Sequence, residues 1–201
     1  AQDDVIKVLV VGKGVPAEFL AQVGRIAGEL KGNLDITCAG ENDFRAALEG
    51  KSWDAVVFDP PSAVALDRQT VVKWVEGLSQ EVRKLVPSAG LYLRQPWSFG
   101  KDDFAKYDEI AFNCMDCAIR NGLETIPSGF AVQAFREECP DAINIVAADG
   151  SLNARGEYLD AAVWAAKFIG KSVTGITYAP PVLKDRDEIV FMRRCAQEAV
   201  N

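Results

Sequence analysis

Residues 149–172 read DGSLNARGEYLDAAVWAAKFIGKS, and this stretch indicates the fold class more clearly than the rest of the chain. It follows an apolar run, residues 143–148, that is typical of a strand buried in a sheet. Asp149 and Gly150 then form a sharp polar turn, and the helix after it stops at Gly170. The predicted apolar face of this helix consists of Tyr158, Ala162, Ala165 and Phe168. Because α/β proteins bind ligands at the carboxyl ends of their strands, we expect Asp149 to lie beside a binding site.

Apolar runs alternate with amphipathic segments over the rest of the chain. The predicted strands are residues 5–11, 34–39, 53–58, 89–93 and 143–148. The predicted helices are residues 16–30, 42–49, 67–86, 102–121, 129–139 and 185–200, besides the one after Asp149. This alternation predicts one three-layer α/β/α domain over residues 1–201, with a five-stranded parallel sheet in the flavodoxin-like order 2-1-3-4-5.

The charge balance of the chain argues against nucleic acid or an anionic membrane as a partner. Its 201 residues include 29 acidic and 22 basic side chains, for a formal net charge of −7. Phosphate-rich partners require clustered Lys and Arg, and no such cluster occurs. No apolar run approaches the roughly twenty residues of a membrane span. The chain starts at Ala1, which fits either a trimmed chain or a mature product cut from a signal peptide, and we expect an exported, periplasmic or extracellular protein.

The five cysteines do not form a disulfide framework, because their number is odd and their spacing irregular. Cys114 and Cys117 form a C-x-x-C motif. They lie inside a predicted helix, whereas a low-pKa redox pair opens a helix after a strand. We therefore expect a pair on one helix face, free or disulfide-bonded, in preference to a redox or metal site.

Five loops follow the predicted strands and should meet at one edge of the sheet: residues 12–16, 39–42, 59–62, 94–98 and 149–153. The candidate ligand-binding residues in these loops are Lys13, Gly14, Glu41, Asp59, Ser62, Arg94, Gln95, Trp97, Ser151 and Asn153. The strand order reverses between the first and third strands, so the residues expected to face one another are Lys13, Gly14, Asp59 and Ser62.

Several chemistries fit parts of these loops. Gly12-x-Gly14-x-x-Ala17 matches a loose dinucleotide fingerprint, but the acid expected at the end of the second strand is missing there. The acids Glu41, Asp59 and Asp149 could act as acid and base or hold a hard cation if they converge, or they are solvated loop residues. Trp97, with Arg94 and Gln95 beside it, is either a binding platform or a cap on the core.

Five segments, in order and spacing, resemble the SGNH (GDSL-like) hydrolase superfamily, in particular its bacterial branch of mostly uncharacterised, often exported proteins. They are VLVVGKGV, WDAVVFDPPS, LYLRQPWSF, NGLETIPSGFAVQAFRE and DGSLNARGEYLDAAVWAAKFIGKS. The resemblance implies a nucleophilic Ser after the first strand, oxyanion-hole donors in the next loops, and an Asp-x-x-His before the last helix.

This sequence departs from that pattern at the decisive positions. Gly14 stands where the nucleophile is expected, and Ser151 stands where the His is expected, with Ala148 or, after a one-residue deletion, Asp149 as the acid. The chain contains no histidine. Since acyl transfer needs a nucleophile and a positioned base, the usual SGNH mechanism is excluded.

We therefore expect a catalytically degenerate SGNH-like protein that binds a small ligand, carbohydrate or acyl-ester-like, in the inherited cleft without a cofactor or metal. One alternative is an active hydrolase that uses Asp59 and Asp149, or Lys13 with Ser62 or Ser151. A second alternative is a nucleotide-binding module. The sequence specifies no oligomeric state.

Overall fold

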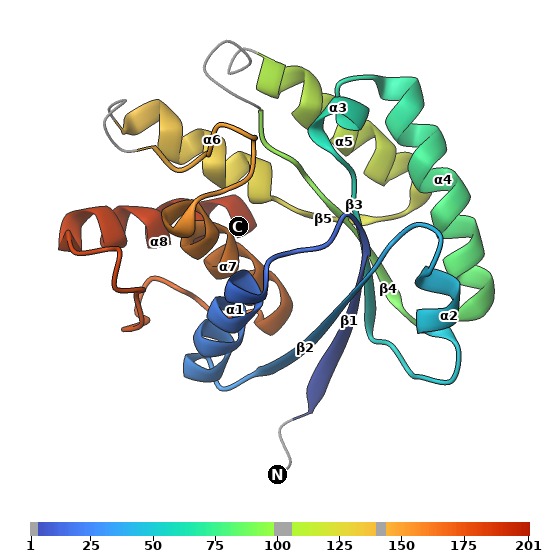
Figure 1. Cartoon of the computed structure of the whole chain (residues 1–201), viewed down its shortest axis with the longest axis horizontal. Helices are drawn as coiled ribbons and strands as arrows, with labels where there is room; N and C mark the ends of the chain where they lie inside the picture. Colours follow the sequence, from blue (N-terminus) through green and yellow to red (C-terminus); the bar gives the residue numbers. More distant parts are fainter. Residues whose placement is uncertain (1–3, 99–105, 140–143) are drawn as a thin grey trace.

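The computed structural model describes residues 4–98, 106–139 and 144–201, arranged around a five-stranded parallel sheet (Figure 1). Its strands are β1 (Val5–Gly12), β2 (Asn33–Ala39), β3 (Ala55–Asp59), β4 (Gly90–Arg94) and β5 (Glu124–Ile126). Their order is β2-β1-β3-β4-β5, and every neighbouring pair is parallel. The predicted three-layer α/β/α fold and its strand order are confirmed.

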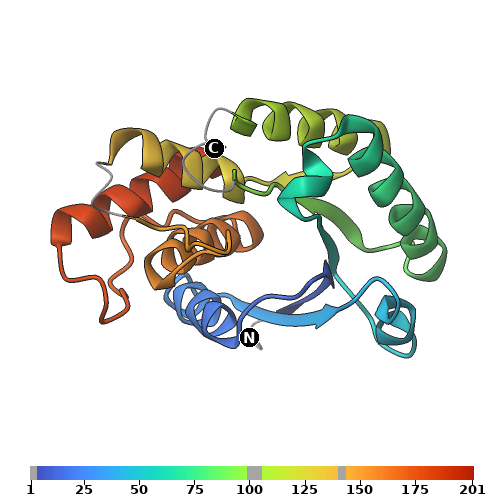
Figure 2. The same ribbon diagram turned by 45° about the horizontal axis from the view of Figure 1, so that its top comes forward.

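Helices cover both faces of the sheet (Figures 1 and 2). One layer contains α1 (Ala17–Glu29), α6 (Ser128–Glu138), α7 (Ala154–Ile169) and α8 (Arg186–Val200). The other contains α2 (Phe44–Leu48), α3 (Ser62–Ala65), α4 (Arg68–Leu85) and α5 (Tyr107–Asn121). Residues 102–105 of the predicted helix 102–121 lie outside the described residues.

Strand β1 is apolar along its length because both of its faces are covered. Val8 and Val10 pack into the hydrophobic cluster with α1 and α7, while Leu9 and Val11 pack into the cluster with α4 and α5. All four side chains are fully buried. Successive side chains of a strand point to opposite faces, so one strand contributes to both cores.

The prediction of a fifth strand at residues 143–148 is wrong. Residue 143 lies outside the described residues, and residues 144–148 make only an isolated antiparallel bridge, Val146 to Leu152. The place beside β4 is taken by β5, whose Glu124–Ile126 pairs with Tyr92, Leu93 and Arg94. The apolar run is buried for another reason, since Ile145 and Val146 pack into the cluster that contains α7.

Helix α7 is buried nearly all round, so the predicted four-residue stripe is too narrow. Its residues from Tyr158 to Ala166 are all buried, and the helix packs against α1, α6 and α8. Asn153 caps its start by accepting from the amides of Arg155 and Gly156. No larger residue fits at position 156 without a shift of the backbone, because a Cβ on Gly156 would lie 2.4 Å from the carbonyl oxygen of Ile145. The residues between Asn153 and Gly170 therefore form a helix that is enclosed by its neighbours.

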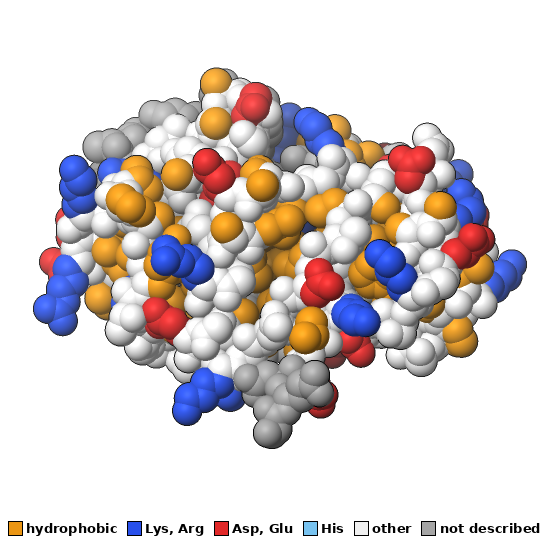
Figure 3. All heavy atoms as spheres, turned by 60° about the horizontal axis from the view of Figure 1, so that its bottom comes forward, with side chains coloured by type: hydrophobic (Ala, Val, Ile, Leu, Met, Phe, Trp, Pro, Cys, Tyr) orange, Lys and Arg blue, Asp and Glu red, His pale blue; other side chains and the backbone are white. Residues whose placement is uncertain are grey.

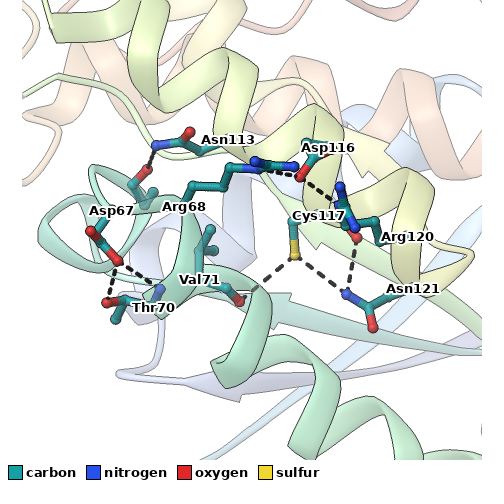
Figure 4. A network of polar contacts seen from close by, with 10 residues as sticks. Asp67, Arg68, Thr70, Val71, Asn113, Asp116, Cys117, Arg120 and Asn121 are labelled. Carbon is teal, nitrogen blue, oxygen red and sulfur yellow. Dashed lines mark hydrogen bonds and ion pairs between the residues drawn. The ribbon is translucent and has the colours of Figure 1, made fainter.

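Cys114 and Cys117 lie on the buried face of α5, in the cluster that α4 also joins. Figure 4 shows Cys117 beside Val71 of α4. Both thiols are free, and burial raises the pKa of Cys114 to about 12 and that of Cys117 to about 11. The Cys117 thiol is 3.7 Å from the Val71 carbonyl oxygen, as expected for a weak hydrogen bond. On the outer side of the same interface, Asp116 pairs with Arg68 and Arg120. The expected pair on a helix face is observed, as free thiols and without a disulfide.

On the molecular face shown in Figure 3, basic and acidic side chains are interspersed with apolar ones, and neither charge forms a continuous patch. Among the helices that the structure describes, none has the length and apolarity needed to cross a membrane.

Candidate functional site

A cavity of about 550 Å³ opens at the carboxyl edge of the sheet, between the loops after β1, β3 and β4 and the loop before α7. Eight of the predicted site residues line it: Lys13, Gly14, Asp59, Ser62, Arg94, Trp97, Asp149 and Ser151. The wall between them is largely apolar, with Val15, Phe19 and Ile110 among its side chains. The four residues expected to face one another from the β1 and β3 loops thus share one cavity.

A buried cluster of three charged side chains, Asp59, Arg94 and Asp160, forms the floor of this cavity. Asp59 ends β3, Arg94 ends β4 and Asp160 lies in α7. The Nη1 of Arg94 is 3.1 Å from Oδ2 of Asp59, and its Nη2 donates to Oδ2 of Asp160. The exposed fractions of the side chains are 14% for Asp59, 8% for Arg94 and 0% for Asp160. One guanidinium therefore holds two carboxylates from different elements out of bulk water.

Burial and the shared counter-ion decide the charge of this cluster. Burial is the largest influence on Asp59 and raises its pKa; the charge of Asp160 also raises it, and the nearby Arg94 lowers it only in part. For Arg94, burial favours the neutral form, but the two carboxylates outweigh it and the pKa lies above its usual value. Arg94 thus remains a cation, and Asp59 is the acid of the cluster with the larger exposure to the cavity.

Three aromatic rings surround the Arg94 guanidinium. Its central carbon lies 5.1 Å from the ring centroid of Trp97, 5.4 Å from that of Trp164 and 5.7 Å from that of Phe19. Trp97 also donates its indole N–H to the carbonyl oxygen of Gly150, 2.8 Å away. Trp97 is partly buried, packs against the hydrophobic cluster that contains α7, and lines the cavity.

Gly14 and Ser151 lie on opposite loops of the cavity. Gly14 has a φ of +98°, which favours glycine, and a Cβ built on it would have no atom within 4 Å. The Ser151 hydroxyl donates to Oδ1 of Asp149 at 2.6 Å, and the Ser151 amide donates to the same oxygen at 3.0 Å. These bonds, with a smaller effect of the Lys13 charge, lower the pKa of Asp149. Asp149 follows no strand, contrary to prediction, yet it still lines the cavity.

Three predicted site residues lie elsewhere and have structural partners. Glu41 accepts from the indole N–H of Trp74, and Gln95 is buried and accepts from the Tyr107 hydroxyl at 2.9 Å. Asn153 caps α7 and donates to the carbonyl oxygen of Asn144. None of the three lines this cavity, and Glu41 does not converge there with Asp59 and Asp149 as expected. Within the residues that the structure describes, no three His, Cys, Asp or Glu side chains are placed to hold a metal ion.

Two acids of α7 that were not predicted also line the cavity, Glu157 and Asp160. A signal was present, because Asp160 interrupts the apolar segment YLDAAVWAA. A carboxylate inside a buried helix requires a partner, and this requirement points to a buried basic residue such as Arg94.

Neither a family model nor a curated protein matches the sequence. Solved structures do match it in fold. A DUF4886 family protein from Bacteroides uniformis superposes with a TM-score of 0.82 at 17% identity, over 98% of this chain and 95% of that chain. A protein described as a GDSL-like lipase, from Parabacteroides merdae, has a TM-score of 0.56 at 13% identity, over 81% and 94%.

A third similar structure is that of Axe2, an acetylxylan esterase from Geobacillus stearothermophilus, as a catalytic mutant with a histidine replaced by alanine. Its TM-score is 0.54 at 15% identity, over 84% of this chain and 95% of that chain. These likenesses extend over most of each chain. The chain therefore has the fold of the SGNH (GDSL-like) hydrolases.

Proposed function

We propose that this protein binds a carbohydrate residue in the cavity at the carboxyl edge of the sheet and does not carry out serine–histidine acyl transfer. The observation that carries the second part is the composition of the chain, which has no histidine, together with Gly14 in the loop after β1. A glycine supplies no nucleophilic oxygen, and Ser151 lacks a histidine to act as its base. Its hydroxyl is instead bonded to Asp149.

The lining of the cavity favours a carbohydrate as the ligand. A sugar presents hydroxyls along its edge and an apolar face of C–H groups. The partly buried Trp97 ring offers a flat apolar surface, while Asp59, Asp149 and Glu157 offer hydrogen-bond acceptors. Ser62 and Ser151 add hydroxyl groups at the same cavity. A few convergent polar groups on an apolar wall are typical of a small-molecule site.

The likeness to Axe2 supports both parts of this proposal. Axe2 is an acetylxylan esterase, so a protein with this fold acts on a substituted sugar polymer. Its histidine-to-alanine replacement is a catalytic mutant, which indicates that its activity depends on a residue type that this chain lacks. Sugar binding without ester cleavage fits both observations.

A thermal-shift screen of mono- and oligosaccharides tests the proposal, because a ligand that binds the native state raises its melting temperature. We expect stabilisation by at least one sugar, and we expect Trp97→Ala to weaken its binding by about tenfold, the effect of losing one stacked ring. Trp74→Ala is the matched control, since Trp74 lies on α4 and does not line the cavity. Stabilisation by no sugar, or equal binding by the Trp97 variant, would contradict the proposal.

One observation favours a second candidate function, hydrolysis by carboxyl groups. Asp59 and Asp149 line the same cavity and their pKa values are shifted in opposite directions, upward for Asp59 and downward for Asp149. Environments that separate two carboxyl pKa values are typical of an acid and base pair. A panel of aryl glycosides and acyl esters separates the candidates. Turnover that disappears in Asp59→Asn and in Asp149→Asn would establish hydrolysis, whereas we expect no turnover above that of the buffer.

A further inference from the structure

Arg94 is the most buried basic residue of the cavity, and the protein itself binds both of its terminal nitrogens. Its two terminal nitrogens are bound to Asp59 and Asp160, and rings of Trp97, Trp164 and Phe19 lie around its guanidinium. Its side chain is 8% exposed. A carboxylate ligand would have to displace one of the two buried acids to form a paired contact with Arg94. The buried arginine is therefore not a receptor for an anionic ligand.

Two polar atoms of the same cluster have no hydrogen-bond partner within the described residues. They are Nε of Arg94, which has a proton to donate, and Oδ1 of Asp160, which has only lone pairs. Both side chains are more than nine-tenths buried, and both residues line the cavity. Both atoms are enclosed by the protein, so contacts with a ligand fall to the more exposed groups of the cavity, among them Asp59.

The remaining charges of the cavity also disfavour an acid. With Asp59 and Asp160, the lining acids include Asp149 and Glu157, against the basic residues Lys13, Arg94 and Lys106. Burial, followed by the charges of Glu18 and Asp160, raises the pKa of Glu157. A raised carboxyl pKa shows that the surroundings already oppose another negative charge.

Resting on the carbohydrate-binding function proposed above, we infer that the floor of the cavity selects uncharged, hydroxyl-bearing sugars and rejects the corresponding uronic acids, with Asp59 as the residue that sets this preference. Asp59 is the member of the buried cluster with the largest exposure to the cavity. Its carboxylate accepts hydrogen bonds from sugar hydroxyls and repels a sugar carboxylate placed beside it.

The test compares methyl glycosides of glucose, galactose and mannose with methyl glycosides of the corresponding uronic acids, by ligand-observed NMR titration at pH 7. For the wild-type protein we expect the neutral member of the best pair to bind about tenfold more tightly, as like-charge repulsion requires. In Asp59→Asn, which keeps the size of the side chain and an acceptor for Arg94, the difference should shrink to about threefold or less. Glu124→Gln is the matched control, because it removes one negative charge from an exposed residue of β5 that does not line this cavity. This control variant should keep the wild-type difference in affinity between the neutral and the acidic glycoside.

Each outcome separates the preference from the function on which it rests. If the wild-type protein binds uronic acids as tightly as neutral sugars, the preference is wrong, and if Asp59→Asn keeps the full difference in affinity, Asp59 does not set the preference. Carbohydrate binding stands in both cases. If no glycoside binds the wild-type protein, carbohydrate binding itself fails and the preference fails with it. Circular dichroism of each variant shows that the compared proteins are folded.

Discussion

The guanidinium of Arg94 neutralises two buried carboxylates, and its removal should destabilise the protein strongly. Arg94→Met leaves Asp59 and Asp160 without a cation at the floor of the cavity. Breaking a buried ion pair by removing one partner typically costs about 3–5 kcal/mol, and we expect a loss of unfolding free energy in that range at pH 7. Urea denaturation monitored by circular dichroism measures it.

The same variant should show a distinctive pH dependence. The pKa of Asp59 is raised even with Arg94 present, and loss of the cation raises it further. Between the unfolded and folded pKa values, the folded state holds a proton that the unfolded chain has released, so unfolding free energy falls as pH rises. The deficit of Arg94→Met against wild type should therefore be smaller at pH 4 than at pH 8. The double variant Arg94→Met/Asp160→Leu should recover about 1 kcal/mol or more at pH 7, and a deficit independent of pH would contradict this account.

Asp59 and Arg94 could be predicted as site residues because each lies at the end of a strand, whereas their partner Asp160 could not be predicted in this way. The strand-end rule locates residues at one edge of a sheet, whereas Asp160 reaches that edge from the side of a helix. Gln95 and Trp97 show the complementary limit. They are two residues apart in one predicted loop, yet Gln95 points inward to Tyr107 and Trp97 lines the cavity. Loop membership does not determine side-chain direction.

Helix α5 carries two cysteines whose burial should protect them from reaction. The pKa values of Cys114 and Cys117 are raised to about 12 and about 11, and the thiolate is the reactive form of cysteine. Both side chains are fully buried between α5 and α4. We expect maleimide labelling at pH 8 to leave both residues unmodified in the native protein and to modify them in denaturant, as peptide mass spectrometry would show. Cys38, which is partly exposed on β2, is the internal control for reagent access. Rapid native labelling of Cys114 or Cys117 would contradict the burial of this helix face.

At the level of elements, the predicted sheet with helices on both faces is confirmed, but the segment predicted as its fifth strand is wrong. The run 143–148 is more apolar than Glu124–Ile126, and periodicity alone favours it. The two segments differ in their backbone pairing, since Thr125 and Ile126 pair with Leu93 and Arg94 of β4. A short apolar segment is buried equally well under a helix or within a sheet, and only the three-dimensional neighbours distinguish the two.

Over the whole molecule, two hydrophobic clusters lie on opposite faces of one sheet and share its backbone. Trp164 is fully buried in the cluster of α1, α6, α7 and α8, and Trp53 is buried in the cluster of α2 to α5. Alternate residues of β1 belong to each cluster, so disordering this strand exposes both. The sheet therefore couples the two helical layers.

We accordingly expect the two layers to unfold in one transition. In a variant that retains only Trp53 and in one that retains only Trp164, with the other tryptophans replaced by phenylalanine, fluorescence reports one cluster at a time. Within each variant, the urea midpoint from fluorescence should coincide with that from far-ultraviolet circular dichroism, because a cooperative transition gives the same midpoint for every probe. Comparing two probes within one variant removes the effect of the substitutions on stability. If the Trp164 signal instead changes at a different urea concentration from the circular dichroism of the same variant, the helical layer around α7 unfolds independently, and the coupling through β1 is weaker than its burial on both faces implies.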